Sequence, residues 1–501
     1  MDMSIPNISK YFRFPFALVT AREDVGRQRE REASSEEKAS SDGGRLKMRR
    51  HHVFMVVVLF TGAHTLALAK PSVEWEVSYG ILEGQNAEAH PHYVLETADG
   101  GFLAIGDAIG YEEGWANVPG CAPPEDEEEA YQKVLLVKVG RDGEKIFQRT
   151  YSSCPGHQLG NSFYETADNY VLCGSAGQRS FLIFADKATG AEVDRWTFDL
   201  GSGSSGCEFV SQLSDGRYVV VGFAEAEDPH NSFYAEGVGR IGILAQNGTL
   251  EVAEDLPEMA QGYRAAPFEG DGLIVAGLGT DNRVFSAALL AISPRGADGP
   301  PIQVRWSRTY PGSGGGDVDH MFGMDLSDNA SAPAVFLTGH TSSENRNWDT
   351  LTMKIDPKTG RELWRRRVGD PRGFDGRFIH DEAWGVRATP DGGCVVVAGT
   401  GDEYGEYSEC RGGDCSDSWK VLLVKFNAAG DVSWTSLFGG PYGGSQGGPV
   451  WQDGAWIPRG EGAGELSDWA GEDIALAPGG GAVVAVDNGQ FGFLKLMGVY
   501  D

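Results

Sequence analysis

The chain is poor in basic residues. Its 501 residues carry 42 lysines and arginines against 72 aspartates and glutamates, a formal net charge of -30 at pH 7. Binding to a phosphate backbone needs a basic surface, so this deficit excludes a nucleic-acid partner. No motif predicts a cofactor. The excess of carboxylates, which are hard oxygen ligands, leaves open a bound divalent cation such as calcium or zinc.

Long apolar runs are also missing. The longest, Val53 to Ala69, is interrupted by Gly62 and His64 and is short for the ~20 residues of a membrane span. It follows a basic stretch and ends in A-x-A, which together predict a signal peptide over 48–69 and a secreted, extracellular protein. The alternative is an uncleaved anchor that holds the protein at a membrane. Residues 1–47 are polar, and we interpret them as a polar leader or a gene-model extension.

The seven cysteines include no C-x-x-C pairs of the kind that hold structural zinc. All seven follow residue 69, and disulfides persist in an exported protein. Two pairs are candidates for such bonds, Cys410 with Cys415 and Cys121 with Cys154. The odd count leaves at least one thiol free, and Cys394, inside a strand-like run, is the predicted one.

Polar, turn-like stretches contain candidate glycosylation sites and candidate ligand-binding loops. N-glycosylation sequons begin at Asn247 and Asn329. Two long loops, Tyr111–Gln132 and Phe438–Asp468, are candidate ligand surfaces in addition to any central channel. Their composition alone names no ligand.

A single sequence motif, called the repeat phrase below, recurs along the chain. Its clearest copies run from Asp381 to Phe438 and from Tyr93 to Tyr151, each with four short β runs separated by glycine turns. Seven copies occur at a spacing of about 60 residues, which predicts an all-β fold: one seven-bladed β-propeller with four-stranded blades over 70–501. A lysine at the end of the third run recurs, which indicates a blade-building role for Lys138, Lys354, Lys425 and Lys495.

The two ends of the repeat array complement each other. The seventh copy stops near Tyr500 and lacks the final run with the pattern W-x-x-x-Y/F-G. That run stands at the other end of the array, at Val73–Tyr79. We therefore expect this N-terminal strand to complete the last blade and close the ring, which removes open sheet edges.

The repeat phrase resembles a known family. Its elements, W-x-x-x-Y-G, D-E-A-x-x-V, T-x-D-G-G, V-V-A-G-T, W-x-V-L-L-V-K and G-x-V-x-W, look like the repeats of secreted bacterial propellers of the delta-60 type. Asp356–Trp364 also resembles the quinoprotein phrase D-x-x-T-G-x-x-x-W. The resemblance implies a propeller and export but no specific activity. A quinoprotein oxidoreductase is the least favoured function, because that family implies adjacent cysteines and eight copies.

Histidines and carboxylates recur just before the innermost strands. They form one candidate pool of acids, bases or metal ligands: His90, His92, His320, His380, Asp381 and Glu382. These segments of a propeller converge around the central channel, so the pool could perform acid–base work there. The alternative is structural: each side chain bonds to loop backbone, while Trp384 and Phe322 pack between blades.

The sequence thus favours a binding or scaffold module for an extracellular protein or carbohydrate, without catalysis. The alternative function is an extracellular enzyme, a lyase or hydrolase acting on polysaccharide with the histidine and carboxylate pool as its site. Histidines that face one another across the channel would favour the enzyme. Histidines bonded separately to loop groups would favour the binding module.

Overall fold

The computed structural model divides the chain into two units, Met1–Thr65 and Leu66–Asp501. The first contains no described residue. Described residues are 70–79, 87–110, 132–152, 158–226, 237–270, 272–280, 284–311, 318–327, 332–342, 348–369, 380–401, 419–439, 450–452, 455–457, 469–488 and 490–500. Within these ranges every regular element is a strand, and no helix suited to crossing a membrane occurs.

Twenty-eight strands form seven antiparallel four-stranded sheets, the blades. The innermost strands of blades 1 to 7 are, in order, β2 (Ala87–Glu96), β6 (Gln158–Glu165), β10 (Ser204–Gln212), β14 (Met259–Phe268), β18 (Val318–Leu326), β22 (His380–Ala388) and β28 (Ala470–Ala477). The second strands are β3 (Phe102–Gly110), β7 (Asn169–Ala176), β11 (Tyr218–Ala226), β15 (Gly272–Gly279), β19 (Val335–Ser342), β23 (Cys394–Gly401) and β29 (Gly481–Asp487). The third strands are β4 (Lys133–Val139), β8 (Arg179–Asp186), β12 (Val238–Leu244), β16 (Val284–Ile292), β20 (Asp349–Ile355), β24 (Lys420–Phe426) and β30 (Phe491–Met497). The outermost are β5 (Lys145–Tyr151), β9 (Glu192–Phe198), β13 (Leu250–Asp255), β17 (Ile302–Pro311), β21 (Glu362–Val368), β25 (Val432–Phe438) and β1 (Ser72–Tyr79).

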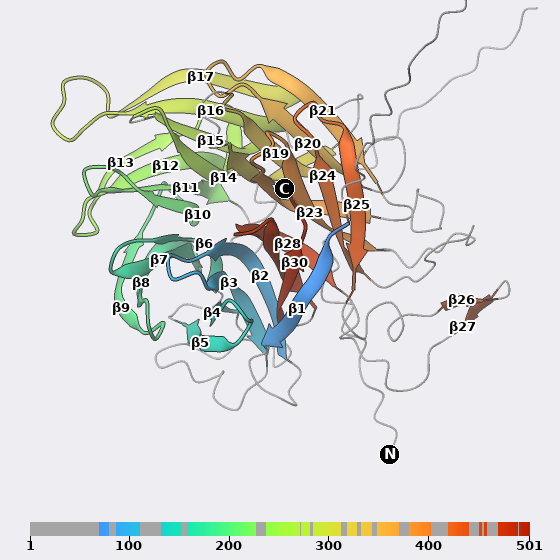
Figure 1. Ribbon diagram of the computed structural model, residues 1–501. Coiled ribbons are helices and arrows are strands. Elements are labelled where there is room, and N and C mark those ends of the chain that lie inside the picture. The colour runs from blue at the N-terminus through green and yellow to red at the C-terminus, as the bar shows by residue number, and fades with distance from the viewer. Residues whose placement is uncertain are drawn as a thin grey trace, which may run out of the picture. The chain divides into compact units, whose positions relative to one another are not determined.

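The predicted seven-bladed propeller is confirmed, including its closure. Blade 7 has the strand order β28-β29-β30-β1, and β1 pairs antiparallel with β30, so that Val77 lies opposite Phe493. Figure 1 shows this seam, with the blue β1 beside the red β30. A separate two-stranded hairpin, β26 (Val450–Gln452) and β27 (Ala455–Ile457), lies outside the blades.

Apolar side chains hold neighbouring blades together. The second and third strands are buried along nearly their whole length, because the preceding blade covers one face of each blade and the following blade covers the other. Seven large hydrophobic clusters result, and each joins two neighbouring blades. The cluster between blades 7 and 1 contains Phe491, Phe493, Phe102 and Val137. The closing contact therefore has the same nature as the other six.

An aromatic side chain of the outermost strand locks onto the next blade. The Trp75 indole donates a hydrogen bond of 2.9 Å to the Arg141 carbonyl and covers Gly143, a glycine with a φ of 82° in the last turn of blade 1. The Tyr79 hydroxyl donates to the Gly143 carbonyl at 2.5 Å. Trp306 packs on Gly360 in the same way. These contacts explain why W-x-x-x-Y recurs.

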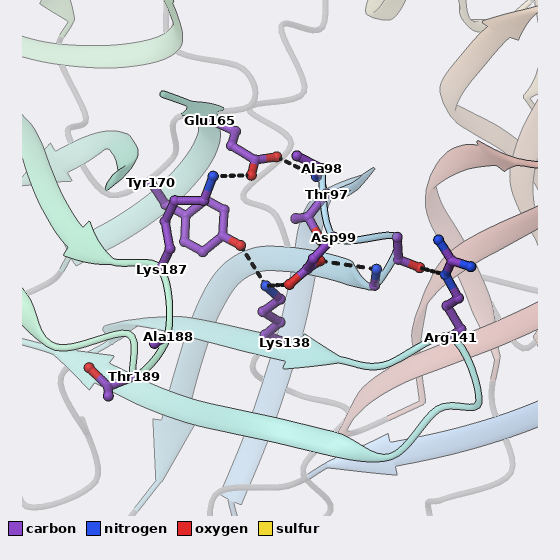
Figure 2. Close-up of polar contacts among 12 residues, drawn as sticks. Thr97, Ala98, Asp99, Lys138, Arg141, Glu165, Tyr170, Lys187, Ala188 and Thr189 are labelled. Carbon is purple, nitrogen blue, oxygen red and sulfur yellow. Dashed lines mark hydrogen bonds and ion pairs between the residues drawn. The ribbon is translucent and has the colours of Figure 1, made fainter. Parts of the chain in front are cut away.

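The recurring lysines support the turns of the blades. Figure 2 shows the Lys138 ammonium between the carboxylate of Asp99, in the first turn of blade 1, and the Tyr170 hydroxyl of blade 2, 2.7 Å away. Although partial burial opposes it, hydrogen bonds from Lys138 and Thr97 lower the pKa of Asp99 to about 2. Lys425 binds Asp391 in the corresponding turn of blade 6. Lys138 and Lys425 therefore tie turns together, whereas Lys495 lies over the rings of Trp75 and Phe102.

Candidate functional site

A β-bulge interrupts the innermost strand of every blade at the same place. The pairing register with the second strand shifts by one residue there, so the bulged residue has no partner in the ladder. Strands β10 and β14 have a second register shift nearer their N-terminal ends. A bulge of this kind redirects its side chain. The seven bulged residues, which we call the channel ring, are His92, Asn161, Glu208, Tyr263, Phe322, Trp384 and Glu472.

A glycine of the second strand permits this bulge in five blades. A Cβ at Gly106, Gly174, Gly222, Gly277 or Gly339 would lie 1.8 or 1.9 Å from a carbonyl oxygen of the innermost strand. Backbone rather than a movable side chain occupies the space. This close approach requires a glycine at the corresponding position of the second strand in blades 1 to 5, whereas Gly399, which ends V-V-A-G in blade 6, faces side chains instead.

The channel ring divides into two arcs around the axis. Blades 7, 1, 2 and 3 contribute a polar arc, and blades 4, 5 and 6 contribute an aromatic arc. All seven side chains, together with Arg264, line one cavity. The space open to the centre of a water molecule is about 20 Å³, which is room for one or two water molecules.

The polar arc is built from buried side chains. Glu208 is 3% exposed, and its Oε1 accepts a hydrogen bond of 3.0 Å from Gln261 Nε2. The Asn161 amide nitrogen donates to the Cys207 carbonyl at 3.0 Å. His92 is held on both sides, with Nε2 2.9 Å from an Asp107 carboxylate oxygen and Nδ1 3.0 Å from the Gly160 carbonyl oxygen. These contacts fix the arc in place.

The aromatic arc is one packed group. The ring centres of Tyr263 and Phe322 are 5.1 Å apart, and those of Phe322 and Trp384 are 4.4 Å apart. Tyr263 and Phe322 are almost fully buried. The expected packing of Trp384 and Phe322 between blades is therefore observed at the channel.

Next to the channel ring, side chains fill the central channel. The Tyr93 ring of blade 1 contacts Phe163 and Phe209, with ring centres 5.6 and 6.2 Å away. It lies 5.2 Å from the guanidinium carbon of Arg264 and 5.6 Å from that of Arg387. Burial raises the pKa of Tyr93 to about 12. Because Tyr93 touches blades 2, 3, 4 and 6, the channel is plugged at this level.

His90 is half-buried and precedes the channel-ring residue His92 by two positions on β2. Its Nδ1 is 2.6 Å from an Asp487 carboxylate oxygen of the second strand of blade 7. Burial, followed by the charges of Asp487 and other neighbouring groups, raises the pKa of Glu472 well above its ordinary value. His90 and Glu472 therefore share one charged neighbourhood.

The histidines of blades 5 and 6 form a different group. Trp348 lies between two rings: its centre is 4.4 Å from His340 and 5.3 Å from His380, nearly parallel to both. The His320 ring is 5.4 Å from His340. Burial lowers the pKa of His320 to about 4. Burial, together with the charges of His320 and His380, lowers the pKa of His340 well below its ordinary value. The sequence missed His340 and Trp348.

The candidate pool is therefore brought together only in part. Asp381 is buried, its backbone amide bonded to the Trp348 carbonyl at 2.8 Å. Glu382 Oε1 is 3.7 Å from His380 Nδ1. His90 and His92, both on blade 1, make separate contacts: His90 with Asp487 of blade 7, and His92 with Asp107 of its own blade and Gly160 of blade 2. These residues lie within the innermost strands rather than before them, because backbone pairing extends beyond the apolar alternation.

Several sequence predictions fall outside the described residues. Cys121, Cys154, Cys410, Cys415 and Asn329 lie there, as do most residues of both long loops. Asn247 lies in the turn between β12 and β13, where its side chain accepts from the Thr249 amide at 3.1 Å. Among the described cysteines, the predicted free thiol Cys394 is free and buried, and so are Cys173 and Cys207. Nor do the described residues contain three His, Cys, Asp or Glu side chains placed to hold a metal ion.

The raised pKa of Glu208 predicts that the stability of the protein depends on pH. Burial, opposed by Arg264 and Gln261, raises its pKa to about 8 in the folded protein. Between its ordinary value near 4.5 and pH 8, the unfolded chain releases a proton that the folded protein keeps. The contribution of Glu208 to the free energy of unfolding is thus fully present below pH 4.5. It is lost as the pH rises to 8, by up to about 5 kcal/mol.

Glu208→Gln removes this titration. We expect urea unfolding to give similar stabilities for wild type and variant at pH 4.5, with the variant clearly more stable at pH 8. Glu144→Gln, at an exposed position, is the matched control and should show no such gap. Equal pH profiles for wild type and Glu208→Gln would contradict the burial of a protonated carboxyl group.

Comparisons with known proteins show resemblance only at the level of fold. No family model and no curated protein matches the chain. Among solved structures, the periplasmic gluconolactonase of Pseudomonas aeruginosa is 11% identical, with 69% of this chain and 84% of that chain covered and a TM-score of 0.42. The quinohemoprotein alcohol dehydrogenase of Comamonas testosteroni is 11% identical, with 86% and 77% covered and a TM-score of 0.41. We draw no conclusion on function from either.

Proposed function

We propose that residues 70–501 act as a secreted binding module, without catalysis, whose ligand engages the channel face. The observation that carries the proposal is the filled channel: the cavity at the channel ring has room for one or two water molecules. Pockets that enclose a substrate usually measure hundreds of Å³. A ligand larger than a few atoms therefore reaches this ring with one protruding group.

The separate contacts of the histidines support the same function. His92 is held between Asp107 and Gly160, whereas His320 and His380 belong to the group around Trp348. Acid–base catalysis needs donor and acceptor groups converging on one reacting bond. The candidate pool is divided between blade 1 and blades 5 and 6. With a net charge of -30, the partner is an extracellular protein or carbohydrate rather than a nucleic acid.

One contact favours a second candidate, a lyase or hydrolase that acts on polysaccharide. The half-buried pair of His90 and Asp487 is close enough for proton transfer, and Glu472 beside it has a raised pKa. A carboxylate that orients a histidine is a common arrangement for a general base. This pair is the one we would expect to carry such a reaction.

The test compares binding with turnover on the same ligands. Purified protein is applied to glycan and extracellular-protein arrays, and each ligand that binds is incubated with it and analysed for unsaturated or reducing ends. We expect saturable binding with no product. Product formation that is lost in His90→Gln, with the exposed-site variant Glu144→Gln as control, would establish the enzyme instead.

A further inference from the structure

We propose that the channel ring binds an alkylammonium group, held between the three aromatic side chains of one arc and the carboxyl groups of Glu208 and Glu472. The proposal rests on the binding function above and names the class of group that enters the channel. A lysine side chain of a protein or an amino sugar would supply such a group. The positively charged head inserts, and the rest of the ligand stays at the mouth.

Oxygen atoms of the polar arc are able to accept hydrogen bonds from a group in the cavity. Glu208 makes one hydrogen bond within the described part of the chain, from Gln261 to Oε1. Its second oxygen is left for the cavity that it lines. Asn161 uses its amide nitrogen on the Cys207 carbonyl, which leaves its amide oxygen for the cavity as well. An ammonium group carries donors and no acceptor, so it matches this set.

The opposite wall offers aromatic surface to a cation. Tyr263, Phe322 and Trp384 come from three consecutive blades and fix one another by ring packing. A cation near the face of such rings is attracted by their π-electrons, more strongly when water is excluded. Neutral sugar hydroxyls would gain less from this wall. Carboxylates on one side and aromatic rings on the other form a cage suited to an organic cation.

Other ligand classes fit the cavity less well. An anion in the cavity would oppose the ionisation of Glu208 and Glu472, which a cation favours. A metal ion would need more ligands than the described residues place in one group. Arg264 contributes a guanidinium to the cavity wall, which lies 5.2 Å from the Tyr93 ring and lowers the pKa of Glu208. The size of the cavity also fits a small ammonium head better than a sugar ring.

Binding should be linked to a proton. At neutral pH Glu208 holds its proton, because burial raises its pKa to about 8. An ammonium group beside it favours the ionised carboxylate, so each cation that binds expels a proton into solvent. The affinity for a cation that stays charged therefore increases with pH. From pH 6.5 to 8.5 the ionised fraction of such a group grows more than tenfold.

The test uses methylammonium chloride as the probe, measured by calorimetry on the purified protein at pH 6.5 and 8.5. Methanol, a neutral molecule of the same size, and sodium chloride at equal ionic strength are the controls. We expect saturable binding of methylammonium that becomes at least about tenfold tighter at pH 8.5. Glu208→Gln should weaken binding and reduce its pH dependence, with Glu472 left as the remaining carboxyl of raised pKa. Trp384→Leu should weaken binding at both pH values.

Trp196→Phe, on the outermost strand of blade 2, is the matched aromatic control and should bind as wild type. Absence of saturable methylammonium binding to wild type, equal binding of methanol, or an unchanged affinity in Trp384→Leu would each overturn the proposal. Circular dichroism shows whether each variant is folded. If a ligand found on the arrays still binds Trp384→Leu and Glu208→Gln, the binding function stands and the ammonium site falls.

Discussion

Replacing Gly339 by alanine is expected to lower the free energy of unfolding by about 3 kcal/mol or more. The new Cβ would lie 1.8 Å from the His320 carbonyl oxygen and 2.9 Å from the Met321 Cα. Both atoms belong to the backbone of the bulged strand β18, so no side-chain rotation relieves the clash. The strand must move or the bulge must be lost, which would also displace Phe322 from the channel ring.

Gly399→Ala is the matched control for this substitution. Gly399 ends the same repeat phrase in blade 6, but its added Cβ would meet the Trp419 ring at 3.0 Å and the Ala470 Cβ at 3.1 Å. The Trp419 ring and the Ala470 methyl group are side-chain atoms that need to shift by only a few tenths of an ångström, so the cost should be below about 1 kcal/mol. Denaturant unfolding of both variants measures the difference. Equal losses would show that the bulge does not depend on a glycine opposite it.

Trp75→Ala is expected to cost about 2–4 kcal/mol and to loosen the seam of the ring. The substitution removes the indole that covers Gly143 and its hydrogen bond to the Arg141 carbonyl. Strand β1 would keep its backbone pairing with β30 but lose its lock on blade 1. Because β1 is joined to the rest of blade 7 by this pairing and not by a hairpin, we expect proteases to cleave the N-terminal segment sooner.

Trp306→Ala tests whether the seam is special. Trp306 makes the same contact inside the ring, with its indole nitrogen 3.0 Å from the Pro357 carbonyl oxygen and its ring over Gly360. Its strand β17 is continuous with blade 4, so the two variants should lose similar stability. Only Trp75→Ala should expose an N-terminal cleavage site in limited proteolysis. Early cleavage in both variants would mean that loss of the tryptophan–glycine contact, rather than the β1–β30 closure of the ring, exposes the cleavage site.

The architecture could be predicted because the repeat fixes it several times over. Each copy carries the same turns and apolar runs, and the strand missing after Tyr500 reappears at Val73–Tyr79. Hydrophobic periodicity reports these features directly. The strand boundaries near His90 and His380 were less visible, because polar residues there continue the backbone ladder.

The channel ring could not be read from apolar alternation, because a bulge adds a residue that breaks the period. A regular spacing nevertheless marks it. Each bulged residue lies five positions before the residue that begins the first turn of its blade, as His92 lies before Thr97 and Trp384 before Thr389. Glu208 precedes Leu213 by the same interval. Aligning the copies on their turns would have identified Asn161, Glu208, Tyr263 and Glu472.

The aromatic group of blades 5 and 6 was missed for a different reason. His340 on β19 lies directly opposite His320 on the neighbouring strand β18. Trp348 reaches the group from the residue before the third strand. Such neighbours are created by pairing between strands, and no spacing along the chain announces them. The sequence identified the members of this group that lie on innermost strands and overlooked the others.

The pairing of β1 with β30 has a mechanical consequence. The ladder is antiparallel, with Ser72 opposite Met497 at one end and Tyr79 opposite Phe491 at the other. A pulling force applied through the two ends of the ring would load the hydrogen bonds at Ser72 and Met497 first, and would break them one after another like a zipper. The six other blades are each made from one contiguous segment and would not feel this load until the seam had opened. Under tension, therefore, the propeller should unfold from blade 7 outward at low force.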